Sequence, residues 1–323
     1  MTPAEVAAGL QEAVAAFVAA RTAPSDALCV GLSGGRDSVV LLHLLGAAVA
    51  PGRLTAIHVN HGLSPRAEAW SEFCARLCAD WGVPLVQRRV EIDRSAGEGL
   101  EAAARRARYR AFADHGAPVL FLAHHRDDQA ETLLFNLLRG TGVAGAGAMR
   151  AERAQGGQRI LRPLLAVGGD AIAAYGAAAG LAWIDDESNG DTALARNFLR
   201  HEVMPLLASR FPAASARLAA AAAHFAEADH LLAELAAADW AALARGEGVR
   251  VAVLRTLEGP RLKNLLRWRL RVLGWRAPAA SRLDEFARQL RQAGPGRRPQ
   301  LVLPDGEMRV VRGVLAWHPA AGR

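Results

Sequence analysis

Residues 31–38, with the sequence GLSGGRDS, combine glycines, hydroxyl groups and a carboxylate in a pattern suited to holding a phosphate. Glycines let a backbone approach a ligand closely, and successive N–H groups at a helix start form a nest for anions. Ser33 and Ser38 would add hydroxyl donors, and Asp37 is close enough to hold a Mg²⁺ ion that bridges phosphates. An ordinary glycine turn in which Asp37 stabilises the helix dipole has the same pattern, so both interpretations stay open.

The loop differs from a Walker A motif. The pattern Gly-x-x-x-x-Gly-Lys-Ser/Thr is absent, and Lys263 is the only lysine in the chain. Backbone amides would therefore provide most of the binding to any phosphate. The lysine count also excludes a lysine nucleophile from the N-terminal half.

A second group of reactive side chains lies in LAHHRDDQAETLLFNLLRG, residues 122–140. Asp128 and Glu131 are three residues apart and share one face of a helix, and Asp127 is also within reach of Glu131. Clustered carboxylates can hold Mg²⁺, bind an ammonium group or accept a proton from an attacking amine. Acidic residues also commonly open helices, so one of the three can be a cap. Of the adjacent His124 and His125, we expect one to be packed and the other to lie nearer the site.

These motifs follow short apolar segments that alternate with helical patterns. We expect strands at 27–33, 54–60, 84–92 and 119–125, and helices at 38–49, 66–81, 98–114 and 127–139. Such alternation predicts an α/β fold with a parallel, Rossmann-like sheet and right-handed crossovers. Ligands bind at the carboxyl ends of the strands in such sheets, which is where each motif lies.

The rest of the chain has a different pattern. We expect an ATP-binding catalytic domain at 1–211, a helical linker at 212–247 and a small α+β domain at 248–323. In the last domain we expect a strand at 248–257, helices at 260–275 and 281–294 with Ser281 as a cap, and strands at 299–304 and 308–317 around an Asp305-Gly306 turn.

The formal net charge of +7 is concentrated at the C-terminal end. Residues 251–323 contain 15 Lys and Arg against 5 Asp and Glu, which leaves the rest with 24 basic against 27 acidic residues. This surplus predicts a polyanionic partner for the C-terminal domain, although an arginine-rich solvated surface would have the same composition.

Cys29, Cys74 and Cys78 have no zinc-type spacing, which favours packed, reduced thiols. No apolar stretch reaches the ~20 residues that a membrane span needs, and no signal sequence is visible, so we expect a cytoplasmic protein.

Together the motifs identify a family resemblance. SGGRDS resembles the signature of the PP-loop, or N-type ATP pyrophosphatase, superfamily. The segments AIHVNHGLS, EAAARRARYRAF, LRPLL, WIDDESN and ARNFLRHEVMPLL, with the 122–140 motif, resemble the tRNA(Ile)-lysidine synthetase family. The resemblance is dense from about residue 28 to 207, and longer members of the family carry a further C-terminal domain.

The resemblance implies a two-step ligation. ATP adenylates the C2 oxygen of the wobble cytidine in an isoleucine tRNA with a CAU anticodon. The ε-amine of L-lysine then attacks C2, which gives lysidine, AMP and diphosphate. A homodimer is also implied.

It also suggests roles for individual residues. Asp37 would hold Mg²⁺, Arg105 and Arg108 would stabilise phosphate charge, and Asp128 and Glu131 would receive lysine. The arginines could instead be surface ion-pair partners. The residues expected to bind ATP are Ser33, Gly34, Gly35, Arg36, Asp37, Ser38 and His61; those expected to contact tRNA are Arg196, Asn197 and Arg200.

Three other functions are compatible with an ATP-binding loop of this type. A tRNA thiolase on the same fold would need active-site cysteines or a Cys-x-x-Cys site, which this chain lacks. The activity of a small-molecule adenylating synthetase would not explain the basic C-terminal domain. A passive nucleotide-binding module would gain nothing from carboxylates beside the phosphates. Diphosphate release measured with and without tRNA and lysine separates these alternatives.

Overall fold

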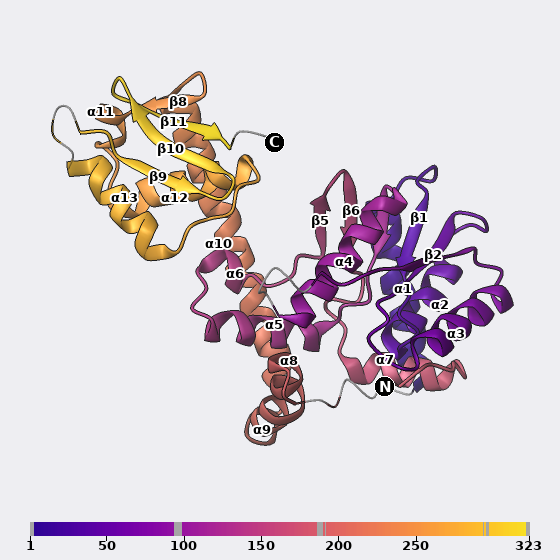
Figure 1. Cartoon of the computed structure of the whole chain (residues 1–323). Helices are drawn as coiled ribbons and strands as arrows, with labels where there is room; N and C mark the ends of the chain where they lie inside the picture. Colours follow the sequence, from indigo (N-terminus) through magenta and orange to yellow (C-terminus); the bar gives the residue numbers. More distant parts are fainter. Residues whose placement is uncertain are drawn as a thin grey trace. The chain divides into compact units, whose positions relative to one another are not determined.

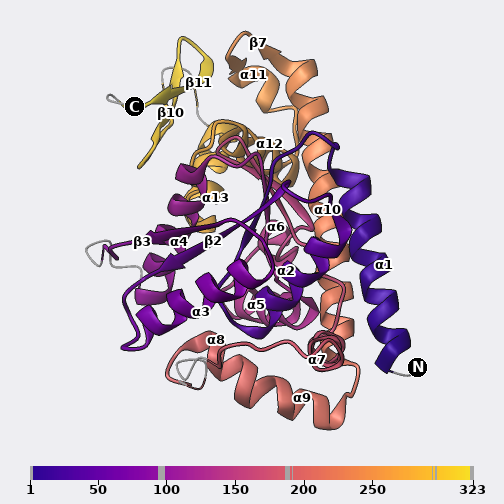
Figure 2. The same cartoon turned by 90° about the vertical axis from the view of Figure 1, so that its right-hand side faces the viewer.

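The computed structural model describes residues 3–93, 99–185, 190, 192–292, 294 and 297–320. The chain forms two compact units, Met1–Ala226 and Glu227–Arg323. Helix α10 (Ala214–Leu243) contains this division and is one unbroken helix in both views of the chain (Figures 1 and 2). The Ala-rich region therefore forms a single helix, and the division falls inside the predicted linker at 212–247.

The first unit is built on a six-stranded sheet in the order β3-β2-β1-β4-β6-β5. All neighbouring strands are parallel except β5 and β6, which form an antiparallel hairpin. The α/β expectation is confirmed, and the hairpin was not predicted. The strands are β1 (Leu28–Gly31), β2 (Leu54–Asn60), β3 (Leu85–Arg89), β4 (Val119–Phe121), β5 (Glu152–Gln155) and β6 (Gln158–Leu161).

Helices cover both faces of this sheet. Leu28 and Val30 of β1 pack with α1, α2, α3 and α7 on one face, whereas Cys29 packs with Phe112 of α4 on the other. Alternate residues of a strand point to opposite faces, so an apolar run such as Leu28–Gly31 suits a strand covered on both sides. The helices are α1 (Pro3–Arg21), α2 (Arg36–Ala48), α3 (Ala67–Asp80), α4 (Leu100–His115), α5 (Arg126–Leu138), α6 (Val143–Ala146), α7 (Gly169–Ala178), α8 (Ala195–Phe198), the π-helical turn η2 (Leu199–Val203) and α9 (Met204–Arg210).

The predicted elements of this unit are close to the observed ones. Helix α2 begins at Arg36, two residues before its predicted start, so Asp37 lies in the first helical turn. The three cysteines are buried and free, which confirms packed thiols. None of the helices in the described part of the chain is long and apolar enough to cross a membrane.

The second unit has an antiparallel sheet in the order β7-β8-β11-β10-β9. Leucines of α12 and α13 pack with β9, β10 and β11 in a core that is separate from that of the first unit. Its elements are β7 (Ala244–Arg245), β8 (Gly248–Arg250), α11 (Val251–Leu254), α12 (Gly259–Val272), α13 (Ala280–Gln292), β9 (Gln300–Leu303), β10 (Gly306–Val311) and β11 (Val314–Pro319).

Three expectations for this unit were wrong. The strand predicted at 248–257 ends at Arg250, because a helical turn follows. Ser281 is not a cap, because α13 begins one residue earlier. The segment 308–317 forms parts of two strands, separated by a turn at Arg312-Gly313 in which both residues have positive φ. The predicted turn between β9 and β10 is present but lies one residue earlier, at Pro304-Asp305, because Gly306 begins β10 and pairs with Leu303.

Candidate active site

The loop between β1 and α2 is shaped by its own hydroxyl groups. Ser38 Oγ accepts a hydrogen bond from Ser33 N at 3.1 Å and donates to Gly35 O at 2.8 Å. The two serine hydroxyls are 3.0 Å apart. Gly34 has φ +89° and no room for a side chain, since a Cβ there would lie 2.8 Å from Ile184 Cδ1. The loop therefore holds one curved backbone conformation before α2 starts.

The start of α2 is open to an anion. Gly35 is the N-cap residue, and no side chain makes the capping hydrogen bond. The first amides of a helix need partners from outside the helix and carry its positive dipole. This geometry fits the predicted phosphate-binding role of residues 33–38.

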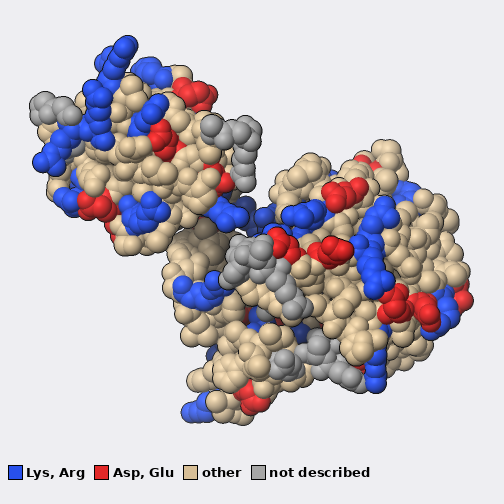
Figure 3. Space-filling view, viewed as in Figure 1, with Lys and Arg blue, Asp and Glu red and all other residues tan. Residues whose placement is uncertain are grey.

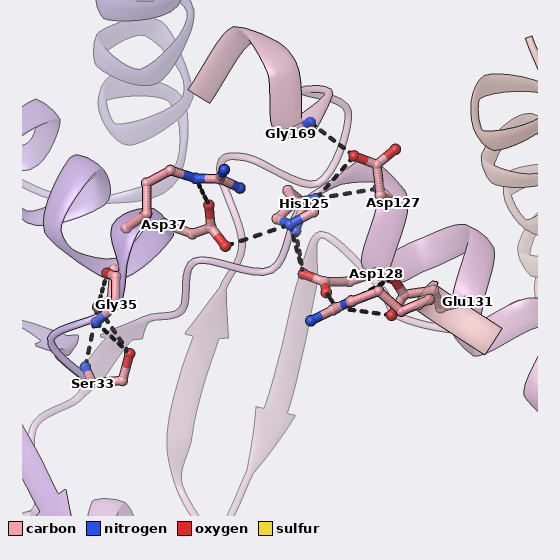
Figure 4. Close-up of polar contacts among 11 residues, drawn as sticks. Ser33, Gly35, Asp37, His125, Asp127, Asp128, Glu131 and Gly169 are labelled. Atoms are coloured by element: carbon pink, nitrogen blue, oxygen red, sulfur yellow. Dashed lines mark hydrogen bonds and ion pairs between the residues drawn. The ribbon is translucent and has the colours of Figure 1, made fainter. Parts of the chain in front are cut away.

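His125 lies at the centre of the acidic side chains (Figure 4). This residue is 6% exposed, and Nδ1 accepts a hydrogen bond from Asp127 N at 3.2 Å at the start of α5. Nε2 is 3.5 Å from Asp37 Oδ2 and 3.6 Å from Asp128 Oδ2. Burial lowers the pKa of His125, but the surrounding carboxylates outweigh it and raise the pKa above 6.5. Because Nδ1 accepts, the neutral ring carries its proton on Nε2, facing the carboxylates.

Asp37 connects the loop to this histidine. Arg36 Nε donates to Asp37 Oδ1 at 3.0 Å, and about a third of the Asp37 side chain is exposed. Burial raises the pKa of this carboxyl, but His125 and Arg36 outweigh that effect and lower it below 3.8. Asp37 is therefore ionised at neutral pH and still reachable from solvent.

Asp127 is occupied by structural hydrogen bonds. It accepts from Gly169 N at 2.8 Å, at the start of α7, and from the hydroxyl of Ser215 on α10. Burial raises the pKa of Asp127, and these hydrogen bonds with the nearby His125 outweigh it and lower the pKa. Asp127 thus joins α5, α7 and the N-terminal part of α10.

Arg200 holds the other two carboxylates. It donates from Nη2 to Asp128 Oδ1 at 2.6 Å, and from Nε and Nη2 to the two oxygens of Glu131 at 2.8 Å each. Glu131 is 5% exposed, and burial raises its pKa although Arg200 opposes that shift. The π-helical turn η2 supplies Arg200, and such turns are frequent at functional sites.

A group of arginines surrounds the neighbouring residue, His124. Burial lowers the pKa of His124 well below 6.5, and the charges of Arg162, Arg105, Arg108 and Arg196 lower it further. Arg162 is 2% exposed and donates from Nε to His124 Nδ1 at 3.2 Å. The adjacent histidines therefore separate two groups of opposite charge, with His124 neutral on the basic side.

His61 borders the basic side as well. Its pKa is lowered to about 4 by burial first, and then by the charges of Arg108 and His58. Its Nδ1 is buried and has no hydrogen-bond partner in the described part of the structure. His61 is therefore neutral at pH 7, and one of its ring nitrogens is left unpaired among the described residues.

The residues predicted from the sequence form neighbouring groups in the first unit, and their functional roles stay predictions. Asp37, Asp128 and Glu131 meet through His125 and Arg200. Arg196 lies over the Phe135 ring, with 5.4 Å between its Cζ and the ring centroid. The motif WIDDESN lies partly outside the described residues. Reasoning from the sequence missed four contributors: His125 as the centre, Arg162, Gly169 and Ser215. The only signal for His125 in the sequence was the pair of adjacent histidines, and the only signal for Arg162 was the LRPLL motif.

Two family models match this chain. Residues 6–207 match the model of the PP-loop domain family, and residues 250–315 match that of the TilS substrate binding domain. The chain is 46% identical over 303 residues to tRNA(Ile)-lysidine synthase from Alkalilimnicola ehrlichii, covering 93% of this chain and 68% of that protein. It is 51% identical over 278 residues to the same enzyme from Aromatoleum aromaticum, covering 85% and 65%. The chain thus spans about two thirds of the length of these relatives.

One solved structure shows the same fold at low identity. A U34-tRNA thiolase, NcsA from Methanococcus maripaludis, matches with a TM-score of 0.55 and 16% identity, over 69% of this chain and 80% of its own. That similarity is limited to the fold. On the family matches and the identity to its relatives, this chain belongs to the tRNA(Ile)-lysidine synthase family.

Proposed function

We propose that this chain uses ATP to join L-lysine to C2 of the wobble cytidine of tRNA(Ile) with a CAU anticodon. The observation that carries the proposal is the position of His125 between the carboxylate of the phosphate-binding loop and the acidic pair of α5. Asp37 and Asp128 are both within 3.6 Å of its Nε2. An adenylation site and an amine site thus share one imidazole.

The first step is adenylation of the cytidine. The amides of the loop and of the first turn of α2 hold the phosphates of ATP. The C2 oxygen of the base attacks the α-phosphorus, and diphosphate leaves toward the arginines around His124, which stabilise its charge. His124 remains neutral among them and adds a hydrogen-bond donor without repelling these cations.

The residues present fit a magnesium ion as part of this step. Asp37 is ionised, partly exposed and next to the loop, so it would hold the ion. Among the described residues, no group of three His, Cys, Asp or Glu side chains forms a metal cage. That is the usual situation for Mg²⁺, which takes one or two carboxylates with phosphate oxygens and water. The ion would neutralise phosphate charge during adenylation.

The second step is attack by lysine. The ε-ammonium group of lysine replaces the Arg200 guanidinium between Asp128 and Glu131, because it carries the same charge and also donates hydrogen bonds. The amine must lose a proton before it attacks, and Glu131 accepts it, since burial raises the pKa of that carboxyl. The nitrogen then bonds to C2, the C2–O bond breaks, and AMP leaves with the oxygen.

The cysteines do not favour the thiolase alternative. Burial raises the pKa of Cys29 and Cys78 to about 11 and that of Cys74 to about 12. A thiol that attacks or binds a cluster must be a thiolate, which needs an exposed and electropositive surrounding. None of the three has that surrounding.

The test is incorporation of radiolabelled lysine into a tRNA(Ile) transcript with a CAU anticodon, in the presence of ATP and Mg²⁺. We expect one lysine per tRNA, with AMP and diphosphate formed in equal amounts. The control transcript has a GAU anticodon and therefore no wobble cytidine, and we expect no incorporation there. Diphosphate release that is independent of tRNA would overturn the proposal in favour of a small-molecule synthetase.

A further inference from the structure

The second unit contains a pocket that the proposed chemistry does not use. It has a volume of about 350 Å³ and is formed by residues of α12 and α13 and by Arg255, which directly follows α11. Four of its lining residues are cationic and one is acidic. The lining residues are Arg255, Gly259, Lys263, Asp284, Ala287, Arg288, Arg291 and Gln292.

The two helices bring these cations together. Residues 284, 288 and 291 recur at helical spacing, so they share one face of α13. Lys263, one turn into α12, crosses to that face and pairs with Asp284 at 2.8 Å. On the outer side, Arg288 pairs with Glu285 at 2.6 Å, which lowers the pKa of Glu285 to about 2.

Arg291 is the pocket cation that a ligand can contact most readily. It is exposed, and among the residues that the structure describes none forms an ion pair with it. Its guanidinium lies against the start of α12, because a Cβ at Gly259 would be 3.3 Å from Arg291 Nη1. The glycine therefore leaves room for the guanidinium beside the positive end of a 14-residue helix.

We propose that this pocket binds a phosphodiester group of the tRNA backbone. Its lining carries a surplus of three positive charges, and none of the eight lining residues is aromatic, so it has no surface on which a base could stack. Basic side chains also gather along the edge of this unit where α11 and α13 lie (Figures 1 and 3). The positive charge of the pocket and of the surface around it suits a phosphate of a long polyanion better than a small nucleotide. The surrounding cations also attract the neighbouring phosphates of the polyanion. The inference rests on the proposed function, since it takes tRNA as the substrate.

The first test is the salt dependence of tRNA binding. The double variant Lys263→Gln, Arg291→Gln removes two pocket cations, and the control Arg309→Gln, Arg312→Gln removes two from exposed positions of the same unit. One lost phosphate contact reduces the slope of log affinity against log salt by roughly 0.7 to 0.9. We expect that loss in the pocket variant and a smaller one in the control. Equal losses in both variants would mean a general surface charge and overturn the inference.

The second test uses Lys263 as a reporter. Because it is the only lysine, reductive methylation with ¹³C-formaldehyde labels its ammonium and the chain N-terminus alone. Dimethylation keeps the charge, so the site is still cationic. We expect the Lys263 signal to shift when tRNA is added at low salt and to return at high salt. An unchanged signal at saturating tRNA would overturn the inference.

Activity separates this inference from the proposed function. At saturating tRNA, the pocket variant should keep the kcat of lysine incorporation and require more tRNA to reach it. If the wild-type chain incorporates no lysine but binds tRNA with the pocket-dependent slope, the pocket inference stands and the proposed function fails. If lysine is incorporated and the pocket variant matches the control in slope and KM, only the pocket inference fails.

Discussion

The charged groups of the candidate active site and of the pocket between α12 and α13 are organised in opposite ways. In the candidate active site of the first unit, a buried carboxylate is paired with a half-buried cation: Glu131 is 5% exposed, and both of its oxygens accept hydrogen bonds from Arg200. In the pocket of the second unit, the arginines are exposed, and the contact of Arg288 with Glu285 lies on the outer surface of α13. Buried charges need partners in a fixed geometry, whereas exposed charges are screened and adaptable.

This difference separates two tasks. A site that moves protons and phosphoryl groups needs fixed distances, which a buried network provides. A surface that attracts a polyanion needs only positive charge near the chain. We therefore expect substitutions in the candidate active site to change rates and stability together. Substitutions in the pocket should change affinity and its salt dependence.

The largest effect is expected from Asp37→Asn. It removes a charge next to the phosphate-binding loop and keeps the shape, so diphosphate release should fall by at least about 100-fold. Asp80→Asn, at the exposed end of α3, is the matched control and should leave the rate unchanged. Wild-type turnover in Asp37→Asn would rule out its role with the metal ion. A loss of unfolding free energy beyond about 2 kcal/mol would instead indicate that Asp37 mainly stabilises α2.

The next effect tests the buried network directly. Arg200→Met leaves Asp128 and Glu131 without their cation, and we expect the free energy of unfolding to fall by about 2 to 3 kcal/mol at pH 7. Adding Glu131→Gln should restore part of that loss, because the double variant no longer buries two unpaired carboxylates. Arg210→Met, at the exposed end of α9, is the control. Additive losses in urea unfolding would contradict the coupling.

Stability should also depend on His61. Its pKa is about 4 in the folded chain against 6.5 for an ordinary histidine, so the unfolded chain binds the proton first as pH falls. This contribution is fully present above pH 6.5 and is lost between pH 6.5 and about 4. In the wild type, this group should lower the free energy of unfolding by on the order of 2 kcal/mol as the pH falls through that range. His61→Gln should abolish this decrease, as measured by thermal unfolding. His224→Gln, exposed on α10, should not; parallel profiles for both variants and the wild type would contradict the assignment.

Local patterns in the sequence were enough to predict the four parallel strands β1–β4 of the first sheet. Apolar runs such as Leu54–Asn60 alternate with helical segments, and the rule for parallel sheets then places every motif at one edge. The C-terminal strands were less clear, because the turn at Arg312-Gly313 lies inside a run of β-branched and apolar residues. The β5–β6 hairpin is short and its first strand is largely exposed, so its pattern is weak.

The pairing of the site residues could not be predicted. Arg200 is 72 residues from Asp128, and Ser215 is 88 residues from Asp127. Spacing along a helix indicates which side chains share a face, but it does not identify a partner from another element. The sequence therefore indicated an acidic pair, and the structure adds Arg200, which contacts both of its carboxylates.

The smallest effect concerns the exposed pair of the second unit. Glu285→Gln removes the carboxylate that holds Arg288 and so makes the net charge beside the pocket more positive by one unit. Because exposed ion pairs contribute little, the midpoint of thermal unfolding should stay unchanged within error. Binding of tRNA should become tighter by no more than about fivefold at low salt, since Arg288 is then available to phosphate. Gln289→Glu adds a negative charge one helical turn after Glu285 and should weaken tRNA binding by a similar factor. If Glu285→Gln instead lowered the unfolding midpoint by several degrees, the pocket would depend on fixed charge pairs as the candidate active site does.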